Sequence, residues 1–327
     1  MSALLEVEDL RVRFRSMSTL QALAARNSDP FIDAVCGVSF QVGEGETLGL
    51  VGESGSGKST IARSIMGLIP AHSGSVRFDG QELTGLGQSA YGTVRRNLAM
   101  MFQDPVGSLS PRLTVRSLIT EPFKIHGLKE RDLAAEAKRL LEMVGLNEDF
   151  GRRFPHQLSG GQARRVGVAR ALALDPNMII ADEPTAGLDV SVQGEVLNLL
   201  ARLQGELGLS ILIITHNLNV VRHITDRMAI MYLGRFVEQG QTEEVFHRAQ
   251  HPYTEALLSA NPEPDPDAAL NRIEIKGEVP SLMNRPSGCE FHTRCLYAQE
   301  TCRSVPPGVT ESPENHYFTC HFPLRGA

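Results

Sequence analysis

The feature that most constrains this chain is a run of eight residues that fits the pattern G-x-x-x-x-G-K-[ST] in full. A buried-strand pattern, Thr47–Val51, precedes the run, and an apolar-periodic stretch, Thr60–Leu68, follows it. Glycines let the backbone wrap around a phosphate, and the next helix contributes the positive end of its dipole. The order strand, loop, helix therefore favours a phosphate-binding loop over a merely structural turn. The residues concerned are Gly52, Glu53, Ser54, Gly55, Ser56, Gly57, Lys58 and Ser59, with Thr60 next in the chain.

Two side chains of this loop and two carboxylates further on carry the expected chemistry. Lys58 can reach the β- and γ-phosphates of a nucleotide, and Ser59 can ligate Mg²⁺. The apolar strand Met178–Asp182 ends in a carboxylate and is followed by Glu183, which places both acids at the carboxyl edge of a parallel sheet. There Asp182 would hold the Mg²⁺, and Glu183 would orient or deprotonate the attacking water. The alternative is that the two acids cap a helix, which the upstream phosphate loop disfavours.

A third motif is Leu158-Ser159-Gly160-Gly161-Gln162, at the start of a helix that carries several arginines. A serine with two glycines at a helix start is a second candidate anion site. An ordinary helix cap is the alternative, and the motif is weakly specific when taken alone.

Composition narrows the class of protein. With 327 residues, two domains are expected, and 42% hydrophobic content excludes disorder as the dominant state. A net charge of −6 disfavours general nucleic-acid binding. No apolar run approaches the ~18 residues that span a bilayer, and the acidic N-terminus lacks the plan of a signal peptide. We therefore expect a cytosolic chain that works at a membrane only through other subunits.

Strands alternate with helices, which predicts an α/β fold with a largely parallel sheet. Strands are expected at 4–14, 35–42, 47–51, 177–182, 210–215 and 227–233. Helices are expected at 129–144, 161–174 and 190–207, a hairpin region at 74–86, a helix end and strand at 93–105, and a loop or helical insertion at 15–30.

The order of the motifs resembles that of the ATP-binding cassette (ABC) ATPases over roughly residues 4–250. The resemblance implies a P-loop NTPase fold of the ABC type, with a RecA-like core, an antiparallel β subdomain and an α-helical subdomain at about 93–160. It also implies that two cassettes close on ATP, so that Ser159, Gly160, Gly161 and Gln162 contact the γ-phosphate in trans.

The resemblance assigns roles to four further residues. Gln103 would sense the Mg²⁺ and the attacking water, His216 would contact the γ-phosphate and Glu183, and Asp189 would cross the dimer interface. Phe31 is the candidate for stacking on adenine, with a strand-edge core phenylalanine as the alternative.

Two positions depart from the family pattern. Ala163 stands where the family usually has a basic residue, and Asn217 stands where it usually has an aspartate after the histidine. Neither position carries a predicted chemical group, so we expect an altered rate rather than loss of activity.

The segment after about residue 250 looks like the tail of the oligopeptide/dipeptide importer ATPases, a group that also serves nickel and glutathione importers. His251–Leu258, Gly277–Ser281 and Pro286–Cys295 carry this resemblance. We expect a cassette at 1–250 and a small C-terminal domain at 251–327, with a Pro-rich acidic linker at about 261–267.

Four of the five cysteines stand in this tail: Cys289, Cys295, Cys302 and Cys320. Their spacing does not select a cofactor, because structural zinc sites and bacterial ferredoxins use tighter pairs. Some members of the resembled family bind a [4Fe–4S] cluster through this tail, so we expect that cluster, with zinc, free thiols or disulfides as alternatives. Cys36 is expected to be a small buried hydrophobe in a strand.

These features predict an ATP-hydrolysing subunit that powers import of peptides or a similar small solute at the cytoplasmic face of the membrane. The expected partners are a second cassette, identical or paralogous, two permease subunits and, indirectly, an extracytoplasmic solute-binding protein. The alternatives are a soluble ABC ATPase of repair or translation, and an importer ATPase gated by a redox-sensing Fe–S tail.

Overall fold

The computed structural model describes residues 3–16, 30–104, 107–128, 130–260, 273–312 and 315–324. The chain forms two compact units, each assembled from separate stretches of sequence. Unit 1 contains Met1–Leu5, Val42–Thr47 and Phe78–Ile214, and unit 2 contains Glu6–Gln41, Leu48–Arg77 and Thr215–Ala327. The expected insertion at 15–30 and the linker at 261–267 fall mostly or wholly outside the described residues.

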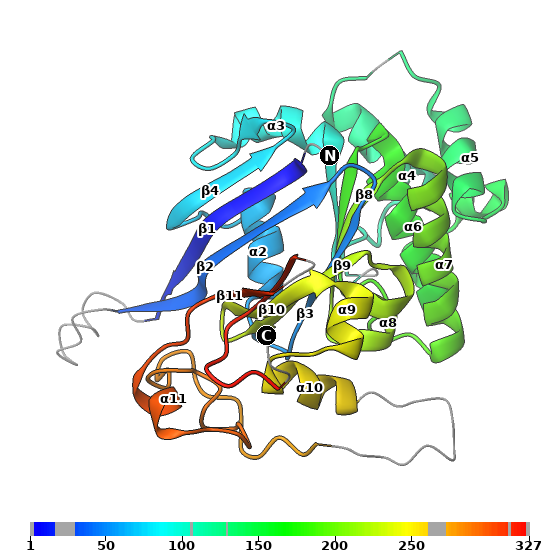
Figure 1. Ribbon diagram of the computed structural model, residues 1–327. Coiled ribbons are helices and arrows are strands. Elements are labelled where there is room, and N and C mark those ends of the chain that lie inside the picture. Colours follow the sequence, from blue (N-terminus) through cyan, green and yellow to red (C-terminus); the bar gives the residue numbers. More distant parts are fainter. Residues whose placement is uncertain are drawn as a thin grey trace. The chain divides into compact units, whose positions relative to one another are not determined.

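Unit 1 is a three-stranded parallel sheet with a group of helices. The strands run side by side in the order β8-β7-β6, with Asp182 opposite Ile214 in the register. Helix α4 packs against α5 and α6, and α6 packs against α7 (Figure 1). The elements are β5 (Gln81–Glu82), α3 (Gln88–Asn97), β6 (Leu98–Met101), α4 (Val115–Ile125), α5 (Leu133–Met143), α6 (Gly160–Ala171), β7 (Met178–Asp182), α7 (Val190–Leu207) and β8 (Ser210–Thr215), with 3-10 turns at Glu148–Arg152, Pro155–Gln157 and Leu172–Leu174.

Unit 2 contains the phosphate loop and the tail. One sheet has the order β2-β1-β4, and the other runs β11-β12-β10-β9-β3, in which β3 and β9 are parallel and the remaining pairs are antiparallel. The elements are β1 (Ala3–Arg15), β2 (Phe31–Gly43), β3 (Thr47–Val51), α2 (Lys58–Ile65), β4 (Ser73–Phe78), α8 (Leu218–Ile224), β9 (Arg227–Tyr232), β10 (Arg235–Gln241), α9 (Thr242–His247), α10 (Pro252–Ser259), α11 (Glu300–Ser304), β11 (Thr310–Ser312) and β12 (His316–Phe318).

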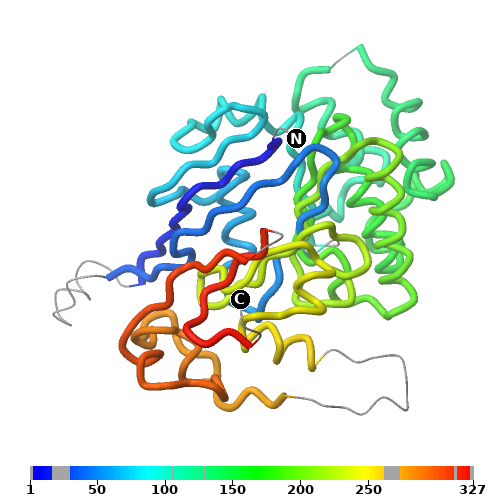
Figure 2. The backbone as a smooth tube through the Cα atoms, in the orientation of Figure 1, coloured from blue at the N-terminus to red at the C-terminus, as the bar shows by residue number. Residues whose placement is uncertain are grey.

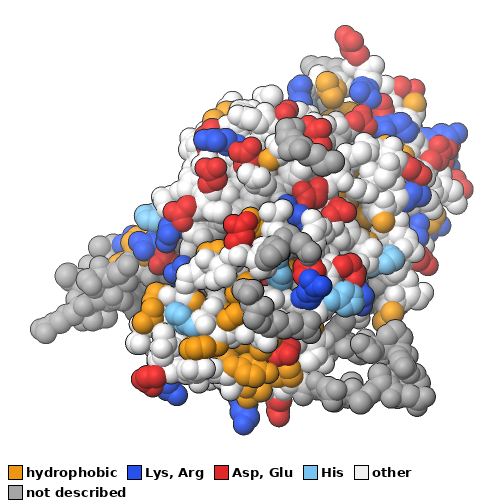
Figure 3. Space-filling model, in the orientation of Figure 1, with side chains coloured by type: hydrophobic (Ala, Val, Ile, Leu, Met, Phe, Trp, Pro, Cys, Tyr) orange, Lys and Arg blue, Asp and Glu red, His pale blue; other side chains and the backbone are white. Residues whose placement is uncertain are grey.

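The tail completes a sheet and a core that begin in earlier parts of unit 2. Strand β12 pairs with β10, so the red end of the chain runs beside the yellow strand in Figure 2. Phe291 belongs to the same buried cluster as Val51 and Tyr232. Several large hydrophobic side chains of the tail are exposed, namely Val279, Met283, Leu296, Tyr297, Val305 and Val309. Figure 3 shows hydrophobic side chains on one face of the molecule. A segment this short cannot bury its apolar residues internally.

The expected pattern of strands and helices is confirmed, with differences at the ends of elements. Helix α5 begins at Leu133 rather than 129, because the Asp132 carboxylate accepts the N–H groups of Ala134 and Ala135 and caps the helix there. Strand β2 begins at Phe31 rather than Val35. Cys36 lies buried in β2, as expected. None of the helices that the structure describes combines the length and apolar composition that a bilayer crossing needs.

Candidate nucleotide-binding residues and cysteine pocket

The phosphate loop of unit 2 depends on glycine backbone geometry. Gly55 and Gly57 have φ angles of 80° and 108°, which L side chains rarely adopt. A Cβ on Gly57 would lie 2.5 Å from the carbonyl oxygen of Ala34, and one on Gly52 would lie even closer to that of Met231. The loop therefore approaches the neighbouring backbone so closely that only glycine fits at these two positions.

Lys58 is the first residue of α2 and points back into the loop. Its side chain is buried, and its Nζ donates to the carbonyl oxygens of Gly52 at 2.7 Å and Glu53 at 2.9 Å. Ser59 and Thr60 follow in the first turn of α2, whose N-cap is Gly57 and has no side-chain cap. The positive end of the α2 dipole and the Lys58 ammonium together suit an anion.

Unit 1 holds the two predicted acids at the carboxyl end of β7. Asp182 is 1% exposed and Glu183 is 8% exposed. Glu183 has a left-handed φ of 51° and donates its N–H to the carbonyl oxygen of Ile214 at 2.8 Å. Such backbone strain in a non-glycine residue concentrates at functional positions.

Arg164 on α6 lies close enough to Glu183 to interact with it electrostatically, and sequence analysis gave it no specific role. The side chain is 2% exposed and donates to the carbonyl oxygen of Ala186 at 2.8 Å. Burial lowers the pKa of Arg164, whereas Asp104 and Glu183 raise it. A buried guanidinium beside two acids offsets part of their charge. The sequence signal was its place among the arginines that follow the Ser-Gly-Gly-Gln motif.

The Ser159–Gln162 motif forms a capping box at the start of α6. The Gln162 N–H donates to Ser159 Oγ at 3.3 Å, and the Ser159 N–H donates to Gln162 Oε1 at 3.0 Å. The helix-cap interpretation is therefore confirmed as local structure. A Cβ on Gly161 would lie 2.6 Å from Val192 Cγ1, whereas Ser159 and Gly160 are exposed. The exposed end of the motif is the part that could contact a ligand.

The remaining predicted residues lie at ends of elements. Gln103 is exposed and follows β6, and His216 is exposed and follows β8. Asp189 is exposed and caps α7, since its carboxylate accepts the Val192 N–H at 3.0 Å. Phe31 begins β2 and is 47% exposed.

The two departures from the family pattern have ordinary structural settings. Asn217 caps α8 by accepting the N–H groups of Asn219 and Val220, as an aspartate would. Ala163 is fully buried on α6.

The four tail cysteines line one small pocket of unit 2, together with side chains that include His251, Phe291 and His321. Burial raises the pKa of Cys289 and Cys295, and raises that of Cys320 to about 11. Backbone N–H groups of Phe291, His292, Tyr297 and Phe322 donate to these three sulfurs and act in the opposite direction. Among the described residues, no group of three or more His, Cys, Asp and Glu side chains has an arrangement that would hold a metal ion.

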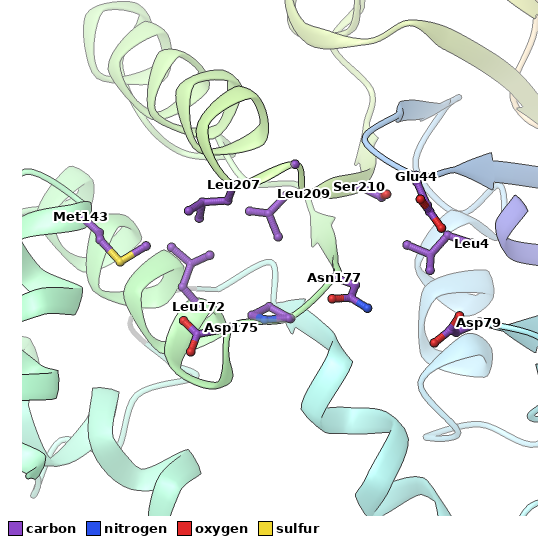
Figure 4. A pocket seen from close by; sticks show the side chains of 12 residues that line it. Leu4, Glu44, Asp79, Met143, Leu172, Asp175, Asn177, Leu207, Leu209 and Ser210 are labelled. Atoms are coloured by element: carbon purple, nitrogen blue, oxygen red, sulfur yellow. The ribbon is translucent and has the colours of Figure 1, made fainter. Parts of the chain in front are cut away.

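Unit 1 has a pocket of its own, which lies at the ends of its strands away from Asp182 and Glu183 (Figure 4). Asn177 directly precedes β7, and Ser210 begins β8, so this pocket faces the amino ends of both strands. Asp182 stands at the carboxyl end of β7. The pocket is therefore distinct from the predicted catalytic residues.

The comparisons with known proteins agree with the fold and the motif order. The family model described as "ABC transporter" matches residues 35–186, and the one described as "Oligopeptide/dipeptide transporter, C-terminal region" matches residues 237–302. The chain belongs to the ABC transporter ATPase family and has its P-loop NTPase fold.

Several curated relatives are peptide-transporter subunits by name. The oligopeptide transport ATP-binding protein OppF of Salmonella typhimurium is 46% identical over 321 residues, 97% of this chain and 95% of the relative. AppF of Bacillus subtilis, also named an oligopeptide transport ATP-binding protein, is 46% identical over 294 residues, 89% of each chain. A solved dimeric cassette, MJ0796 bound to ADP and Pi in a post-hydrolysis state, has a TM-score of 0.62 and 29% identity, covering 73% of this chain and 98% of that one.

Proposed function

We propose that this chain is the ATP-hydrolysing subunit of an importer for oligopeptides. Two features together support this: the complete order of ABC motifs and a tail that matches the oligopeptide/dipeptide family model. Two relatives that are 46% identical to this chain over 89–95% of their own length are named oligopeptide transport ATP-binding proteins. The chain would act peripherally at the inner face of the membrane and drive separate permease subunits.

The phosphate loop would bind ATP through its backbone N–H groups and Lys58. Ser59, Gln103 and Asp182 would hold Mg²⁺, which offsets charge on the phosphates when it is bound. Glu183 would orient the attacking water and accept its proton, and its buried setting excludes bulk water from that proton. Phe31, exposed at the start of β2, would stack on the adenine.

Two copies, or this chain and a paralogue, would close on ATP. The Ser159–Gln162 end of α6, in which Ser159 and Gly160 are exposed, would contact the γ-phosphate bound by the partner subunit, together with His216 and Asp189. Closure is favoured by ATP because ATP then contacts both subunits, whereas in the open state it contacts one. The solved cassette MJ0796, to which this chain is similar, is dimeric in a post-hydrolysis state bound to ADP and Pi, which supports the pairing of two cassettes.

The test is Glu183→Gln in the full complex. Because the amide cannot accept the proton, ATPase turnover should fall by about a hundredfold, while ATP binding persists and the two cassettes stay associated in light scattering. Co-purification of the native complex would identify the permeases and the partner cassette. Unchanged turnover in Glu183→Gln would contradict the assigned role, and co-purification of nucleic acid or ribosomes without a permease would favour the soluble alternative.

We also propose that the cysteine pocket holds a [4Fe–4S] cluster. Four thiols around one pocket, three of them accepting backbone N–H groups, form the donor set that such a cluster uses.

Iron and acid-labile sulfide in anaerobically purified protein test this proposal. About four of each per chain are expected, and Cys302→Ser should lose most of the iron. Cys36→Ala is the matched control, because Cys36 is also buried but lies in β2, outside the pocket. Stoichiometric zinc, or wild-type iron content in Cys302→Ser, would overturn it.

A further inference from the structure

Glu53 of the phosphate loop is paired with a residue 241 positions further along the chain. The Arg294 guanidinium donates to the Glu53 carboxylate through both terminal nitrogens, Nη1 to Oε2 at 2.8 Å and Nη2 to Oε1 at 3.0 Å. The Arg294 side chain is 7% exposed and that of Glu53 is 26% exposed. A bidentate pair with so little solvent contact has a fixed geometry, unlike the usual surface ion pair.

A second tail residue holds the backbone of the same loop position. Tyr253 Oη accepts the Glu53 N–H at 3.1 Å, and the tyrosine is fully buried. Its place is fixed at the start of α10, where His251 Nδ1 accepts the Tyr253 N–H at 3.0 Å. Burial lowers the pKa of His251 to about 4, which keeps the ring neutral and able to accept.

An aromatic cluster supports both tail contacts. Tyr253 and Phe291 each pack on Tyr232 of β9, with ring centroids 4.8 Å and 5.3 Å from it, and Arg294 lies over the Tyr232 ring at 5.9 Å. The Arg294 N–H donates to the carbonyl oxygen of Phe291 at 2.9 Å, so the turn that begins at Cys289 presents the guanidinium. These contacts fix Arg294 relative to β9 and to the loop.

The loop position is thus held at three groups. The Glu53 N–H donates to Tyr253, its carboxylate accepts from Arg294, and its carbonyl oxygen accepts from Lys58. Without Arg294, an unpaired carboxylate would stand within the loop that binds a triphosphate, and like charges at short range in a partly buried site repel strongly.

We propose that Arg294 is a positioning residue of the nucleotide site: it neutralises Glu53 and holds the phosphate loop in its ATP-binding shape. The tail, which is specific to the family, then also contributes a positioning residue to the nucleotide site. This inference rests on the proposed ATPase function. It predicts an effect on nucleotide binding, because the phosphate loop contacts ATP in the ground state and in the transition state alike.

The experiment measures kcat and apparent KM for ATP in the full complex for five variants. Arg294→Gln should raise KM by about tenfold, since small displacements of binding groups have effects of this size or larger, with kcat changed less than about twofold. Arg294→Lys keeps the charge but loses the second hydrogen bond, and should give a smaller rise. Arg303→Gln is the control, because Arg303 lies in the same tail, is 63% exposed and pairs with Glu300 only at 3.8 Å.

The double variant Glu53→Gln with Arg294→Gln separates positioning from simple loss of structure. Removing the carboxylate removes its repulsion of the phosphates, so KM should return to within about threefold of wild type. Should Arg294→Gln fail to fold, Glu53→Gln alone serves: it should raise KM far less than Arg294→Lys does.

Several outcomes would overturn the proposal. These are an unchanged KM in Arg294→Gln, a fall in kcat and melting temperature with KM unchanged, a double variant no better than Arg294→Gln, or Glu53→Gln as impaired as Arg294→Lys. Wild-type protein that neither binds nor hydrolyses ATP would instead refute the proposed function, which these outcomes leave intact.

Discussion

The phosphate loop and the cysteine pocket lie in the same unit but are built on opposite principles. The loop is eight consecutive residues whose glycines set its backbone shape, and its proposed ligand-binding groups are largely backbone N–H groups. The pocket gathers four side chains from positions between 289 and 320, with intervening gaps of five, six and seventeen residues. A contiguous backbone site reveals its ligand in a motif, whereas a side-chain site reveals it only through the spacing of its donors in three dimensions.

The difference predicts where substitutions will act. Changes in the loop should remove ATP binding and turnover, and changes in the pocket should act mainly on the stability of the tail. Arg294 connects the two, because it stands directly before Cys295 and pairs with Glu53.

The largest effect is expected from Lys58→Ala. The buried ammonium is the charged donor that the loop keeps at its centre, so its loss should lower ATPase activity by at least about a hundredfold. Isothermal titration with ATP and steady-state hydrolysis measure the two consequences. Tight ATP binding by Lys58→Ala would contradict the role assigned to the loop.

A smaller effect, which isolates the close backbone approach of the loop, is expected from a matched pair of glycine substitutions. Gly57→Ala places a Cβ 2.5 Å from the Ala34 carbonyl oxygen, whereas a Cβ on Gly55 meets nothing within 4 Å. Gly55→Ala should therefore suffer only the left-handed backbone strain of about 1–2 kcal/mol. Gly57→Ala should in addition distort the loop. Its ATP affinity should be at least about tenfold weaker than that of Gly55→Ala, which is the order of effect that misplaced binding groups have. ATP titrations of both variants compare them, and equal affinities would show that the close approach is unimportant.

The smallest effect on turnover is expected from removing the proposed [4Fe–4S] cluster. Anaerobic chelation should lower the melting temperature by several degrees, because a tail that shares its core with the rest of unit 2 loses a cross-link. ATPase turnover should stay within about threefold as long as Arg294 keeps its partner. Calorimetry measures the melting temperature, and ATP hydrolysis by the same samples measures turnover. Complete loss of turnover with an unchanged melting temperature would contradict the prediction that the cysteine pocket acts mainly on stability.

Much of the fold follows from local patterns. The buried strand Met178–Asp182, the start of α6 next to Ser159 and the extent of α7 agree with sequence expectations because each depends on residues within one or two turns. The start of α5 was missed because a single capping side chain, Asp132, outweighed the apolar periodicity.

The long-range features could not be predicted. The pairing of β10 with β12 places Glu238 opposite Phe318, 80 residues away, and three-residue strands carry almost no periodic signal. The Arg294–Glu53 pair is likewise invisible to any local pattern. The role of Phe31 and the occupant of the cysteine pocket stayed predictions for the same reason: each depends on groups that meet only in the folded protein.

The central proposal is that ATP hydrolysis by this chain drives import. Uptake of short labelled peptides can be measured with the complete transporter and its solute-binding protein in vesicles supplied with ATP on the side of the ATPase. We expect ATP-dependent uptake by the wild-type complex and none by Glu183→Gln assembled into the same complex. Uptake that does not depend on ATP, or that survives Glu183→Gln, would contradict the proposed function.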